Sequence, residues 1–144
     1  MKRDPLKLKE QICFPMYACS REMIKKYRPH LEAIGLTYTQ YIAMIVLWEA
    51  ESISVKELGR ELFLDSGTLT PVLKSLESKG LITRHRSSED ERVLIASITD
   101  SGMELRERAE GIPAMVCGCA RLSPEERDTL RTLLNKLLGR AEEE

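Results

Sequence analysis

The chain has 144 residues, of which 42% are hydrophobic, 31% charged and 5% aromatic, and its formal net charge is −1. These values allow one ordinary core, and they argue against an aromatic-rich β-sandwich and against a globally basic nucleic-acid binder. No apolar run reaches the roughly 18 residues of a membrane span, and the N-terminus leads into a charged segment instead of a signal-peptide core. We therefore expect one mainly α-helical domain, residues 1–144, that is soluble and cytoplasmic and has no membrane partner.

The first predicted element is a helix between Leu6 and Leu31, where apolar residues recur at near-helical spacing. Pro15 interrupts this run, and a proline in a helix interior costs about 3 kcal/mol. The helix is therefore expected either to kink at Pro15 or to begin its regular part there. Both alternatives place Cys13 beside an irregularity.

A second helix is predicted from Thr37 to Glu49, after Gly35 ends the preceding segment. The hydroxyls of Thr37 and Thr39 can cap its first turn. Its apolar side chains form one stripe, made of Tyr41, Met44, Ile45 and Trp48.

Two short helices joined by a tight turn at Phe63-Leu64 are predicted next. The first begins at Ser54-Val55-Lys56-Glu57, which has the capping-box spacing of a hydroxyl followed three residues later by glutamate. Asp65 or Ser66 can cap the second, which Gly80 ends. The apolar residues of this second helix recur at i, i+3, i+4 and i+7: Leu69, Val72, Leu73 and Leu76.

After Gly80 the pattern changes from helical to alternating. Residues 81–86 and 93–98 are β-capable and bracket a polar tip from Ser87 to Glu91, which predicts a hairpin. Thr99 or Asp100 then caps a further helix. Pro113 marks a kink or break in the helical pattern after it.

A last helix is predicted from Ser123-Pro124-Glu125-Glu126, which combines a hydroxyl cap, proline at the first helical position and acids in the first turn. Its leucines recur at helical spacing between Leu130 and Leu138.

The order helix, tight turn, helix and charged hairpin is typical of a winged helix-turn-helix, whose second helix fits the major groove of DNA. Arginines on the hairpin can reach phosphates or an adjacent minor groove. The polar and cationic side chains that this layout exposes are Ser66, Thr68, Thr70, Lys74, Arg84, Arg86 and Arg92.

The charge of this region is balanced, with seven basic and seven acidic residues between Ser54 and Leu94. An ordinary solvated module, whose charges only confer solubility, is therefore the alternative to DNA binding. Acidic residues near the hairpin tip can also hold Arg92 in position through a salt bridge.

Four cysteines are present: Cys13, Cys19, Cys117 and Cys119. In a cytosolic chain they are reactive or buried thiols rather than a disulfide framework. No CxxC pair occurs and the two histidines lie in unrelated segments, so we expect neither a metal site nor another cofactor.

The chain resembles the MarR family of dimeric bacterial transcription regulators over nearly its whole length. The segments that carry the resemblance are Leu64-Asp65-Ser66-Gly67-Thr68-Leu69-Thr70-Pro71, Lys79-Gly80-Leu81-Ile82 and Ser88-Glu89-Asp90-Glu91-Arg92. These motifs add Pro71 and Asp90 to the candidate DNA-binding residues. Within the family, residues 12–17 and 36–41 look like the branch that senses organic hydroperoxides, the OhrR type.

The resemblance implies that Cys13 is the peroxide-reactive residue and that Tyr27 and Tyr38 hydrogen-bond its sulfur. A thiolate attacks a peroxide oxygen, and the resulting sulfenic acid can condense with a second thiol. The family implies a resolving cysteine from the other subunit, for which Cys117 and Cys119 are both candidates. The alternative for Cys13 is a buried small apolar residue, and Cys19 is assigned to that class.

We therefore expect a homodimeric repressor, not an enzyme, that binds an inverted-repeat operator and releases it when an organic hydroperoxide oxidises Cys13. Residues 36–102 form the winged helix-turn-helix, and residues 1–35 and 103–144 the dimerisation helices. Phe14, Met16 and Trp48 are expected to line an apolar pocket for the peroxide. The alternatives are a non-covalent aromatic inducer or another oxidant and, less favoured, a thiol peroxidase.

Overall fold

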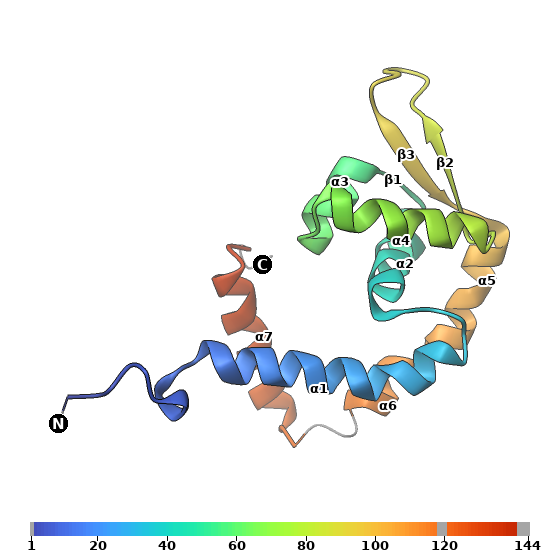
Figure 1. Cartoon of the computed structure of the whole chain (residues 1–144). Helices are drawn as coiled ribbons and strands as arrows, with labels where there is room; N and C mark the ends of the chain where they lie inside the picture. The colour runs from blue at the N-terminus through green and yellow to red at the C-terminus, as the bar shows by residue number, and fades with distance from the viewer. Residues whose placement is uncertain (1, 118–120, 141–144) are drawn as a thin grey trace. The chain divides into compact units, whose positions relative to one another are not determined.

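The computed structural model describes residues 2–117 and 121–140. The chain forms two compact units, Met1–Pro113 and Ala114–Glu144 (Figure 1). They divide at a proline, whose ring lacks an amide hydrogen and clashes with the carbonyl four residues earlier in a continuous helix. The break that the sequence predicts at Pro113 is thus the boundary between the two units.

Helix α1, Cys13–Glu32, follows a short 3-10 turn at Leu8–Glu10. Pro15 lies in its first turn, where the missing amide hydrogen would have no helical partner. Of the two alternatives for Pro15, the structure shows the second, because the regular helix begins at Cys13, two residues before the proline. No side chain caps this helix, because its N-cap residue is Ile12.

Helix α2, Tyr38–Ala50, begins with a complete capping box. The Thr37 hydroxyl accepts from the Gln40 amide at 3.3 Å, and Oε1 of Gln40 accepts from the Thr37 amide at 3.1 Å. Thr37, and not Thr39, is therefore the cap. The predicted apolar stripe needs one correction, since Ile45 is exposed and Leu47 is fully buried.

Helices α3, Val55–Leu62, and α4, Ser66–Ser78, form the predicted pair. The Ser54 hydroxyl accepts from the Glu57 amide at 3.1 Å, and the Asp65 carboxylate accepts from the Thr68 amide at 2.8 Å. The turn between the helices places Phe63 in the left-handed region, at φ 54°. All four predicted apolar residues of α4 are buried: Leu69, Val72, Leu73 and Leu76.

A three-stranded antiparallel sheet of order β1-β3-β2 is formed by the hairpin and one extra strand. Strands β2, Ile82–Arg86, and β3, Leu94–Ile98, form the predicted hairpin, which projects away from α3 and α4 in Figure 1. Strand β1, Ser52–Ser54, was not predicted, and it pairs Ile53 with Ala96. The mainly α fold with a small β wing is confirmed.

Helix α5, Asp100–Ala109, is capped by Thr99. Its first turn contacts α2, because Nε1 of Trp48 donates to the Gly102 carbonyl at 2.8 Å. A Cβ at Gly102 would clash with the Leu81 carbonyl oxygen, so glycine allows this turn to approach the start of the hairpin.

Helix α6, Ile112–Cys117, spans the boundary between the units, and α7, Pro124–Leu137, begins with the predicted cap. Ser123 and Glu126 form a capping box with proline in the first turn. In the described residues, no helix is both long enough and apolar enough to cross a membrane.

Candidate nucleic-acid interface and redox residues

The face of α4 opposite its leucines is polar and open. Ser66, Thr68, Pro71 and Lys74 are exposed. Thr70 differs, since it is half-buried and its hydroxyl donates to the Ser66 carbonyl at 2.7 Å within the helix. The exposed face of α4 therefore presents short hydroxyls near the capped N-terminus and one lysine further along the helix, which is the kind of surface that reads base edges and phosphates.

The hairpin positions Arg92 by a two-point ion pair. Nε and one terminal nitrogen of Arg92 lie 3.1 and 3.2 Å from the two carboxylate oxygens of Asp90. These hydrogen bonds hold the pKa of Asp90 below its usual range, so the carboxylate stays charged. The salt bridge is thus present, and the Arg92 side chain is still 90% exposed.

Arg84 and Arg86 lie on the same strand but differ in their surroundings. Arg86 is exposed, whereas the Arg84 side chain is 18% exposed and pairs with Glu77 of α4 at 3.2 Å. The Arg84 amide also donates to Glu77 at 2.9 Å, and the side-chain bond lowers the pKa of Glu77. Arg84 therefore braces the hairpin against α4, in place of the outward position expected from the sequence.

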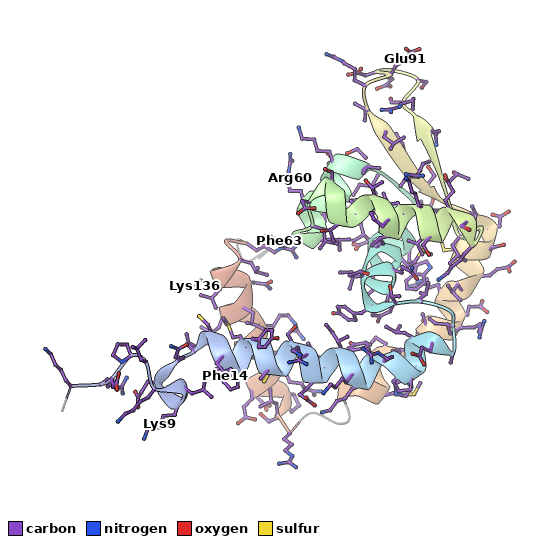
Figure 2. All side chains as sticks on the ribbon, in the orientation of Figure 1. Lys9, Phe14, Arg60, Phe63, Glu91 and Lys136 are labelled. Atoms are coloured by element: carbon purple, nitrogen blue, oxygen red, sulfur yellow. The ribbon has the colours of Figure 1, made fainter. Side chains whose placement is uncertain are left out.

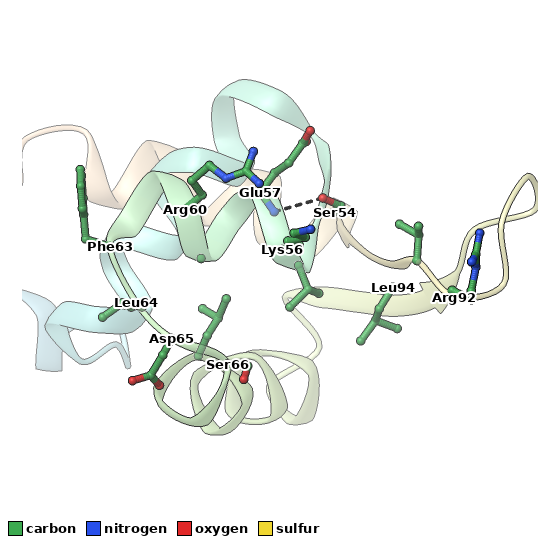
Figure 3. A pocket seen from close by; sticks show the side chains of 14 residues that line it. Ser54, Lys56, Glu57, Arg60, Phe63, Leu64, Asp65, Ser66, Arg92 and Leu94 are labelled. Carbon is green, nitrogen blue, oxygen red and sulfur yellow. Dashed lines mark hydrogen bonds between the residues drawn. The ribbon is translucent and has the colours of Figure 1, made fainter. Parts of the chain in front are cut away.

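A surface groove lies between α3, the start of α4 and residues 92–94 of the hairpin, which are next to its tip (Figure 3). Its wall includes Ser66 and Arg92 from the predicted set, together with Lys56 and Arg60 of α3. These two cations were not predicted as site residues, although their i, i+4 spacing places them on one helix face. We call this feature the α3–hairpin groove; it brings cations from α3 and the hairpin beside the start of α4.

Cys13 is the first residue of α1, and its thiol is free and exposed; the same is true of Cys19 further along the helix. Cys19 is therefore not the buried residue that the sequence suggested. Phe14 and Met16 are also exposed, and Figure 2 shows Phe14 near the N-terminal end of α1. Trp48 is instead hydrogen-bonded to the Gly102 carbonyl. The three residues therefore do not form the expected apolar peroxide pocket within one chain.

Three tyrosine rings pack together where α1 meets α2, and we call them the tyrosine cluster: Tyr27, Tyr38 and Tyr41. The Tyr27 ring centre lies 5.2 Å from that of Tyr38 and 5.7 Å from that of Tyr41. Burial raises the pKa of Tyr38 above its ordinary value, so its phenol stays protonated and able to donate.

The tyrosine cluster is remote from the thiol of the same chain. Cys13 and Tyr27 are 14 residues apart on the continuous helix α1, which at 1.5 Å per residue separates them by about 21 Å. A hydrogen bond between a phenol and a sulfur spans a small fraction of that distance. Within one protomer Cys13 therefore does not meet the two predicted tyrosines, which contact each other.

The two candidate resolving cysteines lie at or beyond the edge of what is described. Cys117 is the last residue of α6, and nothing is described of its side chain. Cys119 lies outside the described residues. Across the described ranges, no three histidine, cysteine or carboxylate side chains cluster as metal ligands.

Comparison with known proteins adds three findings. A family model described as transcriptional regulator SarA/Rot matches residues 21–109. The organic hydroperoxide resistance transcriptional regulator of Bacillus subtilis (strain 168) is 49% identical over 137 residues, covering 95% of this chain and 93% of that protein.

The third finding concerns AbfR, a protein of Staphylococcus epidermidis. Structures of reduced and of overoxidized AbfR, both bound to DNA, match with TM-scores of 0.78 and 0.77. Each is 34% identical and covers 96% of this chain, with 95% and 98% of the AbfR chains covered. The family model begins after Cys13, whereas the relative from Bacillus and the AbfR structures extend over nearly all of the chain.

Proposed function

This chain belongs to the MarR family of winged helix-turn-helix transcription regulators, and from that premise we propose that it is a repressor that releases its operator when an organic hydroperoxide oxidises Cys13. Its relatives are regulators and not enzymes. The proposal includes a cytoplasmic location, a homodimer and an inverted-repeat operator. The observation that carries it is the exposed thiol of Cys13 in a chain whose α4 also exposes short hydroxyls and a lysine.

The DNA side of the proposal rests on side-chain placement. The exposed face of α4 enters the major groove, and Arg86 and Arg92 on the hairpin reach the backbone or the adjacent minor groove. Lys56 and Arg60 of the α3–hairpin groove contact neighbouring phosphates. Because acidic and basic residues balance in this region, the affinity for DNA depends on the positions of these cations and not on a net positive potential.

The proposed homodimer is supported by large apolar side chains that remain exposed in a single chain. Helix α7 exposes a run of leucines, and the start of α1 exposes further large apolar side chains. Burial of such surface against a second copy is favourable by about 25 cal/mol per Å². The leucines concerned are Leu130, Leu133, Leu134, Leu137 and Leu138.

The redox site is shared between protomers in this proposal. Since Cys13 and the tyrosine cluster of one chain are about 21 Å apart, the phenols that hydrogen-bond its sulfur come from the second copy. This requires the two copies of α1 to run in opposite directions, so that the start of each meets the end of the other. A two-fold axis produces such an arrangement.

Oxidation then proceeds in two balanced steps. The Cys13 thiolate attacks the outer peroxide oxygen, an S–O bond forms, the O–O bond breaks and the alkoxide leaves as an alcohol after taking a proton. A second thiol attacks the sulfenic acid and displaces water to form a disulfide; that thiol is Cys117 or Cys119 of the other subunit, or a small-molecule thiol. Overoxidized AbfR is bound to DNA, which favours the disulfide as the releasing step.

The test is operator binding, measured by fluorescence anisotropy on wild type, Cys13→Ser and the matched control Cys19→Ser, with and without an alkyl hydroperoxide. We expect wild type and Cys19→Ser to lose affinity on oxidation and Cys13→Ser to keep it. Release from Cys13→Ser would contradict the mechanism. Intact mass separates covalent oxidation from a non-covalent aromatic inducer, which adds neither oxygen nor a disulfide.

A further inference from the structure

Gln40 is a buried polar side chain, only 7% exposed, and both its Oε1 and its Nε2 are hydrogen-bonded. Its Oε1 accepts from the Thr37 amide at 3.1 Å and from Nζ of Lys79 at 2.9 Å. Its Nε2 donates to the Ser75 hydroxyl at 2.9 Å. A buried amide is stable only where such partners exist, so the position of this side chain is fixed by the groups around it.

The partners of Gln40 belong to a different helix. Ser75 lies in the last turn of α4, and Lys79 is its C-cap residue. The Lys79 ammonium also donates to the Gly35 carbonyl at 2.5 Å, in the turn between α1 and α2. We call Gln40, Ser75 and Lys79 the Gln40 network; it ties the beginning of α2 to the end of the helix that carries the DNA-reading residues.

The Gln40 network also adjoins the tyrosine cluster. Tyr38 is the first residue of α2, two positions before Gln40, and Tyr41 follows it directly. Both Tyr38 and Gln40 lie in the first turn of one helix, so any displacement of Tyr38 that shifts this turn also moves the backbone that carries Gln40. Apolar contacts between α2 and α4 are non-directional, whereas the hydrogen bonds to Ser75 and Lys79 define one relative position of the two helices.

We propose that the Gln40 network transmits the oxidation state sensed at the tyrosine cluster to helix α4, with Gln40 and Lys79 as positioning residues. This inference rests on the proposed function, because it needs a reaction at Cys13 that displaces the phenols of the other protomer. In the reduced dimer the network holds α4 at the orientation that docks on DNA. When Tyr38 moves, the network carries the end of α4 with it.

The measurement is the ratio of operator dissociation constants, oxidised over reduced, for wild type and network variants. Lys79→Met retains the aliphatic stem and removes the ammonium, and Ser75→Ala removes one hydroxyl. Lys26→Met, an exposed lysine of α1 outside the network, is the matched control. Coupling between sites is typically 5–150-fold, so we expect the ratio to fall about fivefold or more in Lys79→Met and to be unchanged in Lys26→Met.

A conservative substitution distinguishes transmission from a merely structural role. Glu at position 40 can accept from Thr37, Lys79 and the Ser75 hydroxyl, so Gln40→Glu is expected to keep the ratio, whereas Gln40→Met is expected to lose it. Intact mass verifies that Cys13 is oxidised equally in every variant.

Two results would overturn the inference in different ways. Network variants that bind DNA less tightly in both states, with the wild-type ratio preserved, would show that the network only stabilises the fold. A ratio of one in wild type itself would contradict the proposed function, and this inference with it, before any variant is compared.

Discussion

The surface proposed to read DNA and the proposed redox residues are built in different ways. The proposed DNA-reading surface lies within residues 52–98 and is held by local interactions: side-chain caps at Ser54 and Asp65, and an ion pair between Asp90 and Arg92. The proposed redox residues are divided between two places: Cys13 is the first residue of α1, with no side-chain cap before it, whereas Tyr27 and Tyr38 pack together where α1 meets α2. One chain forms the first region alone, whereas the second, in the function that we propose, needs another copy.

The largest expected effect comes from the core beneath α4. Leu76 is fully buried, so Leu76→Ala should reduce the free energy of unfolding by about 2–5 kcal/mol, measured by urea denaturation. The control is Thr68→Ala on the exposed face, for which a change within about 0.5 kcal/mol is expected. Equal effects of the two substitutions would contradict the assignment of the faces of α4.

The next prediction is that two arginines of strand β2, Arg84 and Arg86, contribute differently to DNA binding. Arg86→Ala should weaken operator binding and lower the slope of log affinity against log salt by about one, because it removes the phosphate contact that we propose for Arg86. Arg84→Ala should leave the salt slope unchanged, because Arg84 pairs with Glu77 of the same chain. A salt slope that changes in Arg84→Ala and not in Arg86→Ala would contradict these two assignments.

A smaller effect concerns the start of α3. Ser54→Ala removes the hydroxyl that accepts from the Glu57 amide, and loss of such a cap costs about 1 kcal/mol. Thermal unfolding measures the loss, and Ser54→Asp, which retains an acceptor, should restore most of the stability. Failure of Ser54→Asp to do so would indicate that the hydroxyl has another role.

The smallest effect is a pH dependence. Hydrogen bonds from Arg84 lower the pKa of Glu77 below its ordinary value of 4.5. The stability from this pair is therefore present above pH 4.5 and lost as the pH falls through the lower pKa of the folded protein. Glu77→Gln should flatten the acid limb of a stability–pH profile, and an unchanged acid limb would contradict the assignment.

Sequence reasoning succeeded where a few adjacent residues determine the structure. The caps at Thr37, Ser54, Asp65 and Thr99 follow from short polar side chains placed just before an apolar helical pattern. The buried face of α4 follows from its periodicity alone.

The features that the sequence did not predict depend on contacts between different elements of the fold. Strand β1 has three residues, too few for a recognisable alternation, and forms because β3 offers it a partner. Arg84 turns inward because Glu77 lies on another element. The separation of Cys13 from Tyr27 was different, since it could be calculated from their spacing on a predicted helix.

The most direct test of the shared redox site is a heterodimer, purified with two tags, in which one protomer carries Cys13→Ser and the other carries Tyr27→Phe and Tyr38→Phe. If each thiol uses the tyrosines of the other protomer, this heterodimer retains one complete site, because its remaining Cys13 faces unmodified tyrosines. The oxidation rate of that thiol by an alkyl hydroperoxide, followed by mass spectrometry, should then equal the wild-type rate. A rate equal to that of the double tyrosine variant homodimer would contradict the shared site.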